Sequence, residues 1–436
     1  MSDWADDPRI EGLAVYRVGG AIRDQRLGLK PTEHDFVVVG ATPEQMRSRG
    51  FRAVGKDFPV FLHPESHAEY ALARTERKSA PGYRGFEFDT GPEVTLVDDL
   101  KRRDLTVNAI AESREGELID PFDGCRDLQA GVLRHVSDAF AEDPVRLLRL
   151  ARFATRFPGF SIAPETLSLC RRLVTSGEVD HLVPERVWQE MSRALMHDRP
   201  SRFIDVLRET GALARLIPEL EALWGVEQNP EYHPEIDAGV HVMMVLDQAA
   251  AMAAPLDVRF ACLVHDLGKA LTPAEQLPDH HGHERLGLKP VAAVCDRLRV
   301  PNEVRDLAML VCEFHLTCHR AAELRPGTVL KLLRRLDALR RPERFERFLM
   351  ACEADKRGRK GGARRPYPPA SLLRRALEAA RSTPVEPLTA AGLSGAALGE
   401  ALDRARIEAI RAVYAGASSA RRLRRRPPGP ASGTAR

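Results

Sequence analysis

The residue pattern of this 436-residue chain changes at Pro144, and that change is the strongest limit on how it can fold. Upstream, Val, Phe and Tyr recur in short runs separated by turn residues. These runs predict strands at residues 15–18, 36–39, 60–63, 70–73 and 94–97. Downstream, Leu, Arg and Ala recur at helical spacing nearly to the end. We therefore predict an α+β head, a small mixed sheet with helices, followed by an α-helical body.

The length and the 44% hydrophobic content predict several domains. With 65 basic and 62 acidic residues the total charge indicates no class of partner, so only local clusters of Arg and Lys are informative. The seven cysteines are scattered and form no Cys-x-x-Cys pair, which favours a reducing cytoplasm. The acidic N-terminus lacks a signal-peptide core, and no run of about 18 apolar residues occurs. We expect neither secretion nor membrane insertion.

The segment Val-Gly-Gly-Ala-Ile-Arg-Asp at residues 18–24 follows a predicted strand and opens a predicted helix. Gly19 and Gly20 lack the Cβ atoms that would keep a phosphate away. The start of a helix supplies free N–H groups, and Arg23 adds a charged donor. A tight connection between a strand and a helix needs the same glycines. The turn alone is therefore consistent with a triphosphate site and with a simple bend.

Two carboxylates, Glu33 and Asp35, follow on either side of His34 at the start of a predicted strand. Strand residues two apart point to the same face, so both carboxylates can share a site while His34 points elsewhere. Nucleotidyl transfer needs such a pair to hold two Mg²⁺ ions, which activate the attacking 3′ hydroxyl and neutralise the triphosphate. Isolated acid-x-acid pairs are mostly ordinary surface residues. The position beside the Gly-Gly turn favours a catalytic site.

These motifs resemble those of the bacterial CCA-adding enzymes, class II nucleotidyltransferases of the polymerase-β superfamily, with the Gly-Gly-x-x-Arg-Asp signature at residues 19–24. The similarity runs from about residue 13 to about residue 410. It implies template-independent addition and repair of the 3′-terminal CCA of tRNA from CTP and ATP, with release of pyrophosphate. Glu33 and Asp35 are then the catalytic Mg²⁺ ligands, and Gly20 and Arg23 bind the nucleotide. Family members usually have Asp-x-Asp at this point, so Glu33 places its carboxylate one methylene further out.

Residues 98–109 combine three cations with three acids, and we predict that they begin a helix. The resemblance implies that Arg103 faces the nucleotide, that Asp104 fixes the ribose or the arginine, and that Asn108 lies nearby, with Gly19 and Asp24 also supporting the site. Residues 120–128 resemble the family's hinge between head and neck, where small changes at Gly124 would let the head reshape between the C and A steps.

Arginines recur every third residue at Arg146, Arg149 and Arg152, near enough on a helix to form a cationic ridge. An ordinary helix gains nothing from such repulsion, whereas a helix that faces phosphates or a base edge does. Arg146 can donate to a pyrimidine's O2 and N3, and Asp143 can accept from an exocyclic amine. The resemblance implies that Glu142, Asp143 and Arg146 form a protein template, and that Arg149 and Arg152 bind the nucleotide's phosphates or sugar.

Eight of the 14 histidines fall between His233 and His319. The adjacent His265-Asp266 pair resembles the HD phosphohydrolase superfamily, which implies a divalent metal that activates water. Mixed N and O ligands suit nickel, manganese, iron or cobalt better than magnesium, and we expect Ni²⁺. The resemblance implies hydrolysis of 2′,3′-cyclic phosphates, 2′-nucleotides and simple phosphates. The expected ligands are His265, Asp266, His315, His283 and His241.

Cations recur in the last third of the chain at Lys331, Arg334, Arg335, Lys356, Arg357, Arg359, Lys360, Arg364 and Arg365. Such helical faces are often only solvated, but the chemistry of the head favours a contact with the acceptor and TΨC arms of tRNA. We read residues 185–190 as structural support for the neck. The protein is expected to be a monomer or a homodimer.

We predict six regions: an N-terminal extension at 1–12, a nucleotidyltransferase head at 13–140, a helical neck for nucleotide selection and RNA binding at 141–225, an HD domain at 226–330, a helical tRNA-binding region at 331–415 and a basic disordered tail at 416–436. Three alternatives remain. A poly(A) polymerase shares the head, an HD-type phosphohydrolase with an inactive head leaves the head motifs unused, and a noncatalytic RNA-binding protein would tolerate Glu33.

Overall fold

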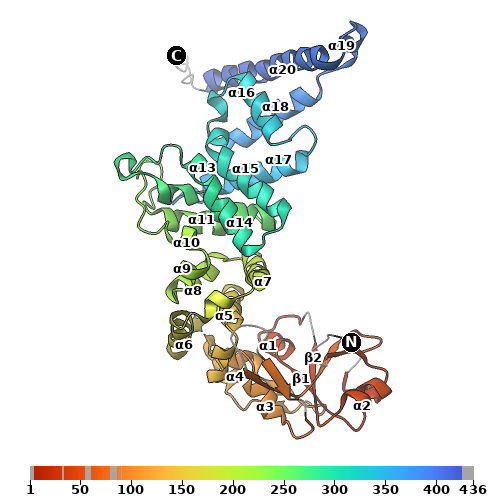
Figure 1. Ribbon diagram of the computed structural model, residues 1–436. Helices are drawn as coiled ribbons and strands as arrows, with labels where there is room; N and C mark the ends of the chain where they lie inside the picture. Colours follow the sequence, from red (N-terminus) through yellow and green to blue (C-terminus); the bar gives the residue numbers. More distant parts are fainter. Residues whose placement is uncertain (1–3, 32–33, 55–59, 79–85, 90, 425–436) are drawn as a thin grey trace, which may run out of the picture. The chain divides into compact units, whose positions relative to one another are not determined.

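A computed structural model describes residues 4–31, 34–54, 60–78, 86–89 and 91–424, without side chains at 76–78, 86–89 and 417–424. The chain forms two compact units, residues 1–218 and 219–436. The class is α+β, as predicted: a sheet near the N-terminus and helices after Pro144 (Figure 1). No described helix has the length and apolar character needed to span a bilayer.

The head is built on a seven-stranded mixed sheet with the strand order β3-β4-β5-β2-β1-β8-β9. Its strands are β1 (Ala14–Val18), β2 (Asp35–Val39), β3 (Arg52–Val54), β4 (Val60–Leu62), β5 (Glu69–Leu72), β8 (Ala111–Glu112) and β9 (Leu118–Ile119). Two smaller pairs are antiparallel β6 (Thr75–Lys78) with β7 (Phe86–Asp89) and parallel β10 (Val132–Leu133) with β11 (Ser161–Ile162). Strands β2 and β5 are parallel, whereas β1 and β2 are antiparallel.

Alternation of side chains along β1 and β2 gives the sheet a core on each face. Val15 and Phe36 pack on one face with Met46 of helix α2 (Pro43–Ser48). On the other face, Val37 packs with Leu100 of helix α3 (Leu96–Lys101). Asp35 is two residues from Val37, so its side chain belongs to the α3 face.

The strand predicted at residues 94–97 does not form, because α3 begins at Leu96. Thr95 accepts a hydrogen bond from the backbone N–H of Asp98 at 3.2 Å, and Asp98 accepts one from the N–H of Thr95 at 3.1 Å. This capping box starts a helix despite the β propensity of the neighbouring valines. Residues 98–109 therefore contain the end of α3 and only one further 3-10 turn, at Thr106–Asn108, instead of beginning a helix.

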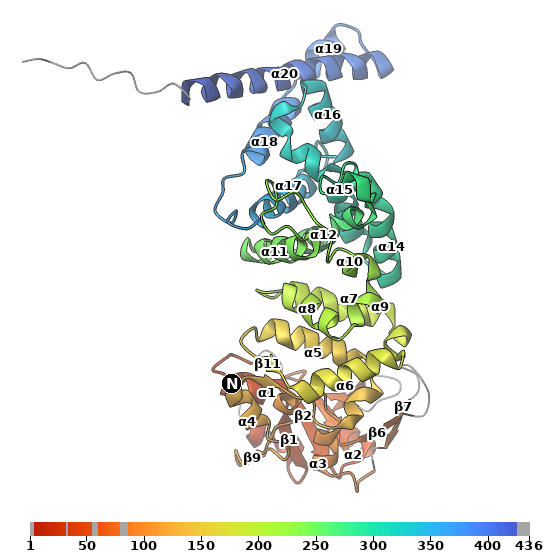
Figure 2. The ribbon, with the colours of Figure 1, turned by 90° about the vertical axis from the view of Figure 1, so that its left-hand side faces the viewer.

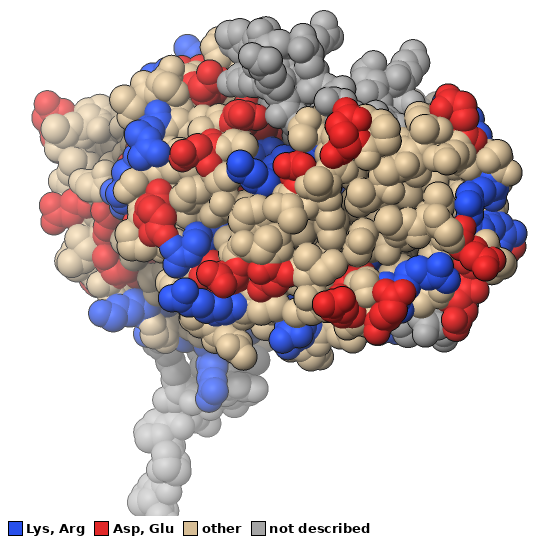
Figure 3. All heavy atoms as spheres, turned by 90° about the horizontal axis from the view of Figure 1, so that it is seen from below, with Lys and Arg blue, Asp and Glu red and all other residues tan. Residues whose placement is uncertain are grey.

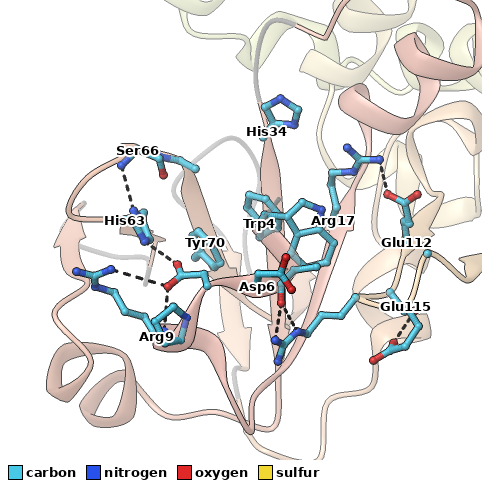
Figure 4. A pocket seen from close by; sticks show the side chains of 18 of the residues that line it. Trp4, Asp6, Arg9, Arg17, His34, His63, Ser66, Tyr70, Glu112 and Glu115 are labelled. Carbon is cyan, nitrogen blue, oxygen red and sulfur yellow. Dashed lines mark hydrogen bonds and ion pairs between the residues drawn. The ribbon is translucent and has the colours of Figure 1, made fainter. Parts of the chain in front are cut away.

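The N-terminal residues, predicted as an extension, pack against the head from Trp4 onward (Figure 4). The Trp4 ring lies 5.0 Å from that of Phe36, and His63 Nε2 donates to Asp7 Oδ2 at 2.8 Å. Together with Arg17 and His34 they line a cavity of about 1140 Å³. Because Phe36 and Asp35 are strand neighbours, this cavity lies on the sheet face opposite to Asp35.

The first unit continues into helices of which α5 packs against α7 and α8. Its helices beyond α2 and α3 are α1 (Gly20–Arg26), α4 (Gly124–Ala130), α5 (Val145–Arg156), α6 (Pro164–Thr175), α7 (Pro184–Leu195), α8 (Ser201–Glu209) and α9 (Ala212–Leu216), with the short α10 (Pro218–Glu221) at the boundary.

The second unit is helical, and α11, α12, α15 and α17 pack against one another, as do α16, α18 and α20 (Figure 2). Its helices are α11 (Ala238–Ala251), α12 (Leu256–Val264), α13 (His283–Leu286), α14 (Leu288–Leu298), α15 (Asn302–His319), α16 (Pro326–Arg335), α17 (Pro342–Arg357), α18 (Pro368–Arg381), α19 (Glu386–Ala390) and α20 (Gly395–Arg424).

Two predicted boundaries differ from the structure. The boundary at residue 330 separates α17 from α11, α12 and α15, although these four helices share one core. The disordered tail predicted from residue 416 begins inside α20, which continues to Arg424, and only residues 425–436 lie outside the described chain. The packing of α17 against helices far upstream has no local sequence signal.

Candidate active site and metal centre

The glycine turn after β1 lies close to the predicted catalytic carboxylate. Gly19 has a φ of 72°, and a Cβ atom there would lie 3.0 Å from Nη1 of Arg103, so a side chain would be strained and crowded. The antiparallel register pairs Val18 with the exposed Asp35, which places Asp35 about 5 Å, one strand spacing, from the residue before the turn. Glu33 lies outside the described residues. The fold therefore brings one predicted metal ligand to the predicted phosphate turn.

Arg23, predicted to bind the nucleotide, is only 3% exposed. Its guanidinium carbon lies 5.1 Å from the ring centre of Phe153 on α5 and 5.2 Å from that of Phe157, the residue after α5. It donates to Asp24 Oδ1 at 2.8 and 2.9 Å and to the side-chain oxygen of Asn108. Burial lowers the pKa of Arg23, and the contact with Asp24 opposes that shift. In this structure Arg23 connects α1 to α5, and a nucleotide would meet it only after these contacts rearrange.

Asp104 is a buried acceptor that joins the head to α5. It accepts from Asn108 Nδ2 at 3.0 Å and from Arg149 Nε at 2.7 Å. Burial alone would raise the pKa of Asp104, but Arg149 and the hydrogen bonds hold it well below its ordinary value. Arg103 lies 3.2 Å from a different carboxylate, Asp99. The arginine that Asp104 fixes is thus Arg149.

The arginines of α5 do not form an unpaired cationic ridge. Arg146 is 7% exposed and donates to the carbonyl of Ala139 at 2.7 Å. Arg152 Nε donates to Glu190 Oε2 at 2.5 Å, and Arg149 pairs with Asp104. The repulsion expected from their spacing is reduced by the carboxylates from other elements that pair with Arg149 and Arg152, which the local sequence did not reveal.

Asp143, predicted to read a base edge, is held at the start of α5. Its Oδ2 lies 3.1 Å from Arg186 Nη2, and its Oδ1 accepts from the N–H of Val145 at 3.0 Å. Glu142 precedes it, half-buried, at the end of a 3-10 turn. Both Arg186 and Glu190 belong to the segment read as neck support, and each pairs with a residue of the predicted nucleotide site.

Gly124, predicted to act as a hinge, lies in close contact with the backbone of another segment. A Cβ atom there would lie 2.2 Å from the carbonyl oxygen of Thr106. Asp120 accepts from the N–H groups of Gly124 and Cys125 at 2.7 and 2.8 Å. The structure thus explains the glycine by close packing of α4, and a hinge motion stays a prediction.

Replacing Asp104 with Ala is expected to destabilise the first unit by about 2–3 kcal/mol, because it leaves Arg149 without its carboxylate. Solvent contact reduces the cost, since the Arg149 side chain is 38% exposed. Because folding depresses the pKa of Asp104, its contribution is full above the unfolded value of about 3.9 and declines as pH falls below it. Urea unfolding at pH 7 and pH 3 measures both effects. Asp198→Ala, which removes an exposed carboxylate, is the control, and an equal loss in both variants would contradict the assignment.

The second unit brings the five predicted metal ligands together with a sixth residue. They come from α11, the end of α12, α13, α15 and α17. All six are at most 4% exposed: His241, His265, Asp266, His283, His315 and Asp355. Gly268 permits the close approach of Asp266 and α13, because a Cβ atom there would lie 2.0 Å from the carbonyl oxygen of His283.

Hydrogen bonds orient the imidazoles toward a common centre. Nδ1 of His265 donates to the carbonyl of Cys262 at 2.8 Å, and Nδ1 of His283 donates to that of His280 at 2.8 Å. A carbonyl only accepts, so Nδ1 carries a proton, and in the neutral ring Nε2 then presents a lone pair. His315 follows the same pattern through backbone carbonyls, and burial holds its pKa well below the ordinary value, so its ring is neutral. Metal-bound histidines are typically held in this way.

The Nε2 atoms face Asp266. Those of His265 and His283 lie 3.2 and 3.1 Å from its carboxylate oxygens. Neither His265 Nε2 nor Asp266 Oδ1 has a well-aligned hydrogen bond among the described residues, although both are fully buried. Buried lone pairs that face one another are costly, and a bound cation would satisfy them. Imidazole nitrogens and carboxylate oxygens fit a transition-metal ion.

Sequence reasoning missed Asp355 and His319. Asp355 Oδ1 lies 3.2 Å from His241 Nε2, and its Oδ2 accepts from His319. Asp355 stands in a charged stretch beside Lys356, which we assigned to RNA contact, so no local pattern singled it out. The centre opens into a cavity of about 480 Å³ whose wall includes Lys269, Arg320, Lys356 and Arg359. Those cations favour an anionic ligand beside the metal.

Comparison with known proteins matches three family descriptions in order along the chain. Residues 15–134 match the poly A polymerase head domain, and residues 159–223 match a probable RNA and SrmB-binding site of polymerase A. Residues 239–342 match the HD domain. The last of these ends before Asp355.

Similar curated proteins cover almost the whole chain. A multifunctional CCA protein of Thioalkalivibrio sulfidiphilus is 60% identical over 405 residues, which span 92% of this chain and 99% of that protein. One of Nitrosococcus oceani is 58% identical over 399 residues, which span 92% and 98%.

Solved structures share the fold. A Bacillus stearothermophilus CCA-adding enzyme in complex with CTP has a TM-score of 0.63 and 23% identity, and covers 95% of this chain and 96% of its own. A Thermotoga maritima CCA-adding enzyme complexed with tRNA has a TM-score of 0.60 and 20% identity, with 93% and 92% covered.

Proposed function

The chain belongs to the multifunctional CCA protein family of CCA-adding nucleotidyltransferases, and from this membership we propose that it builds and repairs the 3′-terminal CCA of tRNA from CTP and ATP. The observation that carries the proposal is the pairing of Asp35 with Val18, next to the Gly19 turn, whose positive φ favours glycine. Catalytic carboxylate and phosphate-binding turn are thereby neighbours in one sheet.

In the proposed reaction the tRNA 3′ oxygen attacks the α-phosphorus of the nucleotide, the bond to pyrophosphate breaks, and the hydroxyl proton is lost to water. Glu33 and Asp35 hold Mg²⁺, which when bound neutralises the triphosphate and acidifies the attacking hydroxyl. The bare backbone at Gly19 and Gly20 admits the phosphates, and Arg103 lies beside that turn to donate to them.

Base selection is assigned to Asp143 and Arg146. Arg186 orients the Asp143 carboxylate, and the Ala139 carbonyl orients the Arg146 guanidinium. Groups held in this way present fixed acceptors and donors to a cytosine or adenine edge without a nucleic-acid template. Arg149 and Arg152 contact the nucleotide's phosphates or sugar, and their carboxylate partners position them.

The acceptor and TΨC arms of tRNA are proposed to contact cations of the last third of the chain. Exposed examples are Lys331, Lys360, Arg364 and Arg365. On the face drawn in Figure 3, acidic and basic side chains alternate around a broad neutral area, so the described part of that face offers no continuous basic surface. We therefore expect the phosphate backbone of the tRNA to bind a different face of the protein.

The HD region is proposed to be a phosphohydrolase for 2′,3′-cyclic phosphates, 2′-nucleotides and simple phosphates. The buried imidazoles and Asp266 hold a transition metal, with Ni²⁺ the expected ion, which when bound acidifies water. Lys269, Lys356 and Arg359 line the same cavity and bind the anionic substrate. Such an activity would clean damaged tRNA ends before CCA addition.

Incubation of the purified chain with tRNA lacking its CCA, radiolabelled CTP or ATP, and Mg²⁺ is expected to add C, C and A and then stop. Sequencing of the labelled 3′ ends measures the product. Long A tails would instead identify a poly(A) polymerase. Absence of incorporation would refute both and leave the phosphohydrolase or a noncatalytic RNA-binding role.

A further inference from the structure

We propose that the cavity between the N-terminal residues and the sheet of the head binds a nucleobase that carries an amino group. Its volume of about 1140 Å³ exceeds the ~300–1000 Å³ of typical small-molecule pockets, so a nucleoside fits inside it (Figure 4). Asp35 points to the other face of the sheet, so this site is separate from the proposed catalytic one. CCA addition does not require it, and the inference therefore goes beyond the proposed function.

A row of side chains across four neighbouring strands forms the wall of the cavity on the sheet. The register pairs Tyr70 of β5 with Phe36 of β2. Phe36 pairs in turn with Arg17 of β1, and Arg17 pairs with Glu112 of β8. Paired residues on neighbouring strands point to the same face, so an aromatic half and a charged half lie side by side. His34, two residues before Phe36, lies on this face as well.

Arg17 supplies a hydrogen-bond donor that lacks an acceptor. Arg17 is 9% exposed, and its Nη2 donates to Gln25 Oε1 at 2.7 Å and pairs with Glu112. Its Nε is buried and has no hydrogen-bond partner among the described residues. An unsatisfied N–H on a buried cation is costly, and a ring nitrogen or a carbonyl oxygen of a ligand would satisfy it.

The charge of the cavity disfavours a phosphate as the group held inside. Arg9 lies 2.7 Å from Glu65, and the Nε of Arg114 donates to the backbone carbonyl of Ala5 at 2.9 Å. These arginines are therefore already engaged. A negative surplus repels an anion and favours a neutral ligand whose N–H groups donate to carboxylates. Carboxylates outnumber arginines among the lining residues, with Asp6, Asp7, Glu65, Glu112 and Glu115 against Arg9, Arg17 and Arg114.

Trp4 adds an aromatic surface to the same cavity. Its half-buried ring lies 5.0 Å from that of Phe36, which stacks on Tyr70 at 4.5 Å. Unpaired bases stack on aromatic side chains of this kind. Cytosine, adenine and guanine each combine a flat ring, an acceptor for Arg17 and an amino group for a carboxylate such as Glu112. Uracil has the ring and the acceptors but lacks the amino group.

Calorimetric titration with single nucleosides tests the proposal. The full chain carrying Asp143→Asn, which disables the proposed base selection at the catalytic site, is titrated in EDTA so that no Mg²⁺ recruits the ligand there. Cytidine, adenosine or guanosine is expected to bind with a Kd below about 1 mM, and uridine at least ~10-fold more weakly. The proposal is overturned if no nucleoside binds within that limit, or if uridine binds as tightly as the best of the other three.

Variants of the cavity wall locate the bound base. Arg17→Lys keeps the positive charge beside Glu112 and removes the Nε–H donor, so it is expected to weaken binding by about 10-fold. Trp4→Leu keeps an apolar contact with Phe36 and removes the stacking surface, with an effect of similar size. Arg47→Lys, a matched change at an exposed arginine of α2 outside the cavity, is expected to bind as the parent does.

Circular dichroism confirms the folding of each variant. If folded Arg17→Lys and Trp4→Leu both bind the nucleoside as tightly as the parent, the base lies elsewhere and the proposal is wrong.

A competition experiment distinguishes the two sources of such a base. Displacement of the bound nucleoside by mature tRNA identifies a base of RNA as the ligand, whereas unchanged affinity in saturating tRNA identifies a free nucleoside. CCA addition is assayed separately on the parent chain. Nucleoside binding without CCA addition would refute the proposed function and support this site, and CCA addition without nucleoside binding would do the reverse.

Discussion

Replacing Asp35 with asparagine is expected to lower kcat for incorporation of both CTP and ATP by about 10³-fold, equivalent to about 4 kcal/mol. The amide keeps the shape of the carboxylate but loses the charge that holds Mg²⁺. Asp35 is exposed at the first position of β2, so the sheet is expected to stay intact. Single-turnover incorporation on tRNA ending in C or CC measures the effect for each nucleotide.

Two controls separate lost chemistry from lost structure in this variant. Glu44→Gln changes an exposed carboxylate of α2, on the sheet face opposite to Asp35, and should leave incorporation unchanged. Phosphatase activity of Asp35→Asn should equal that of the parent, because the histidine centre belongs to the other unit. If the Asp35→Asn variant keeps more than a tenth of the parent kcat, Asp35 is not a catalytic metal ligand.

Replacing His265 with Ala is expected to reduce hydrolysis of 2′,3′-cyclic AMP, 2′-AMP and p-nitrophenyl phosphate by about 10³-fold while CCA addition continues at the parental rate. Nε2 of His265 faces Asp266, and the Nδ1 hydrogen bond to the Cys262 carbonyl is the interaction that orients it. Loss of the ring removes a ligand from the metal centre.

The His265→Ala variant also leaves a void in a fully buried site, so His265→Gln serves as a partner that retains most of the volume. Both variants should lose phosphatase activity and both should keep CCA addition. Joint loss of the two activities in His265→Gln, with an unchanged melting profile, would contradict the assignment of separate sites. If both variants keep phosphatase activity, His265 is not a ligand of the metal centre.

Much of the fold followed from local pattern. Short runs of Val, Phe and Tyr predicted β1 and β2, and the Leu, Arg and Ala spacing after Pro144 predicted α5. The exception at residues 94–97 arose because the side chain of Thr95 caps a helix, an interaction that β propensity does not report. Local motifs also located the Gly19 turn, Asp35 and the His265-Asp266 pair.

The partners of the predicted site residues were not predictable in the same way. Arg149 was expected beside a nucleotide, and the structure pairs it with Asp104, from a loop well upstream in the chain. Arg23 was expected to bind the nucleotide, and the rings of Phe153 in α5 and of Phe157 just after it lie against its guanidinium. Such contacts depend on which elements pack together, and a short sequence window contains no information about an element that lies far along the chain.

The sequence by itself determined the order of the parts: a strand, glycine turn and helix with a carboxylate strand beside them, then an arginine-rich helix, then a cluster of histidines. Backbone conformation and side-chain alternation are local properties, so the amino-acid sequence was sufficient to predict this order. Only the tertiary structure decided that carboxylates pair with Arg149 and Arg152, and that Asp355 joins the histidines. Those outcomes depend on distances between side chains from separate elements, and packing of the whole unit sets those distances.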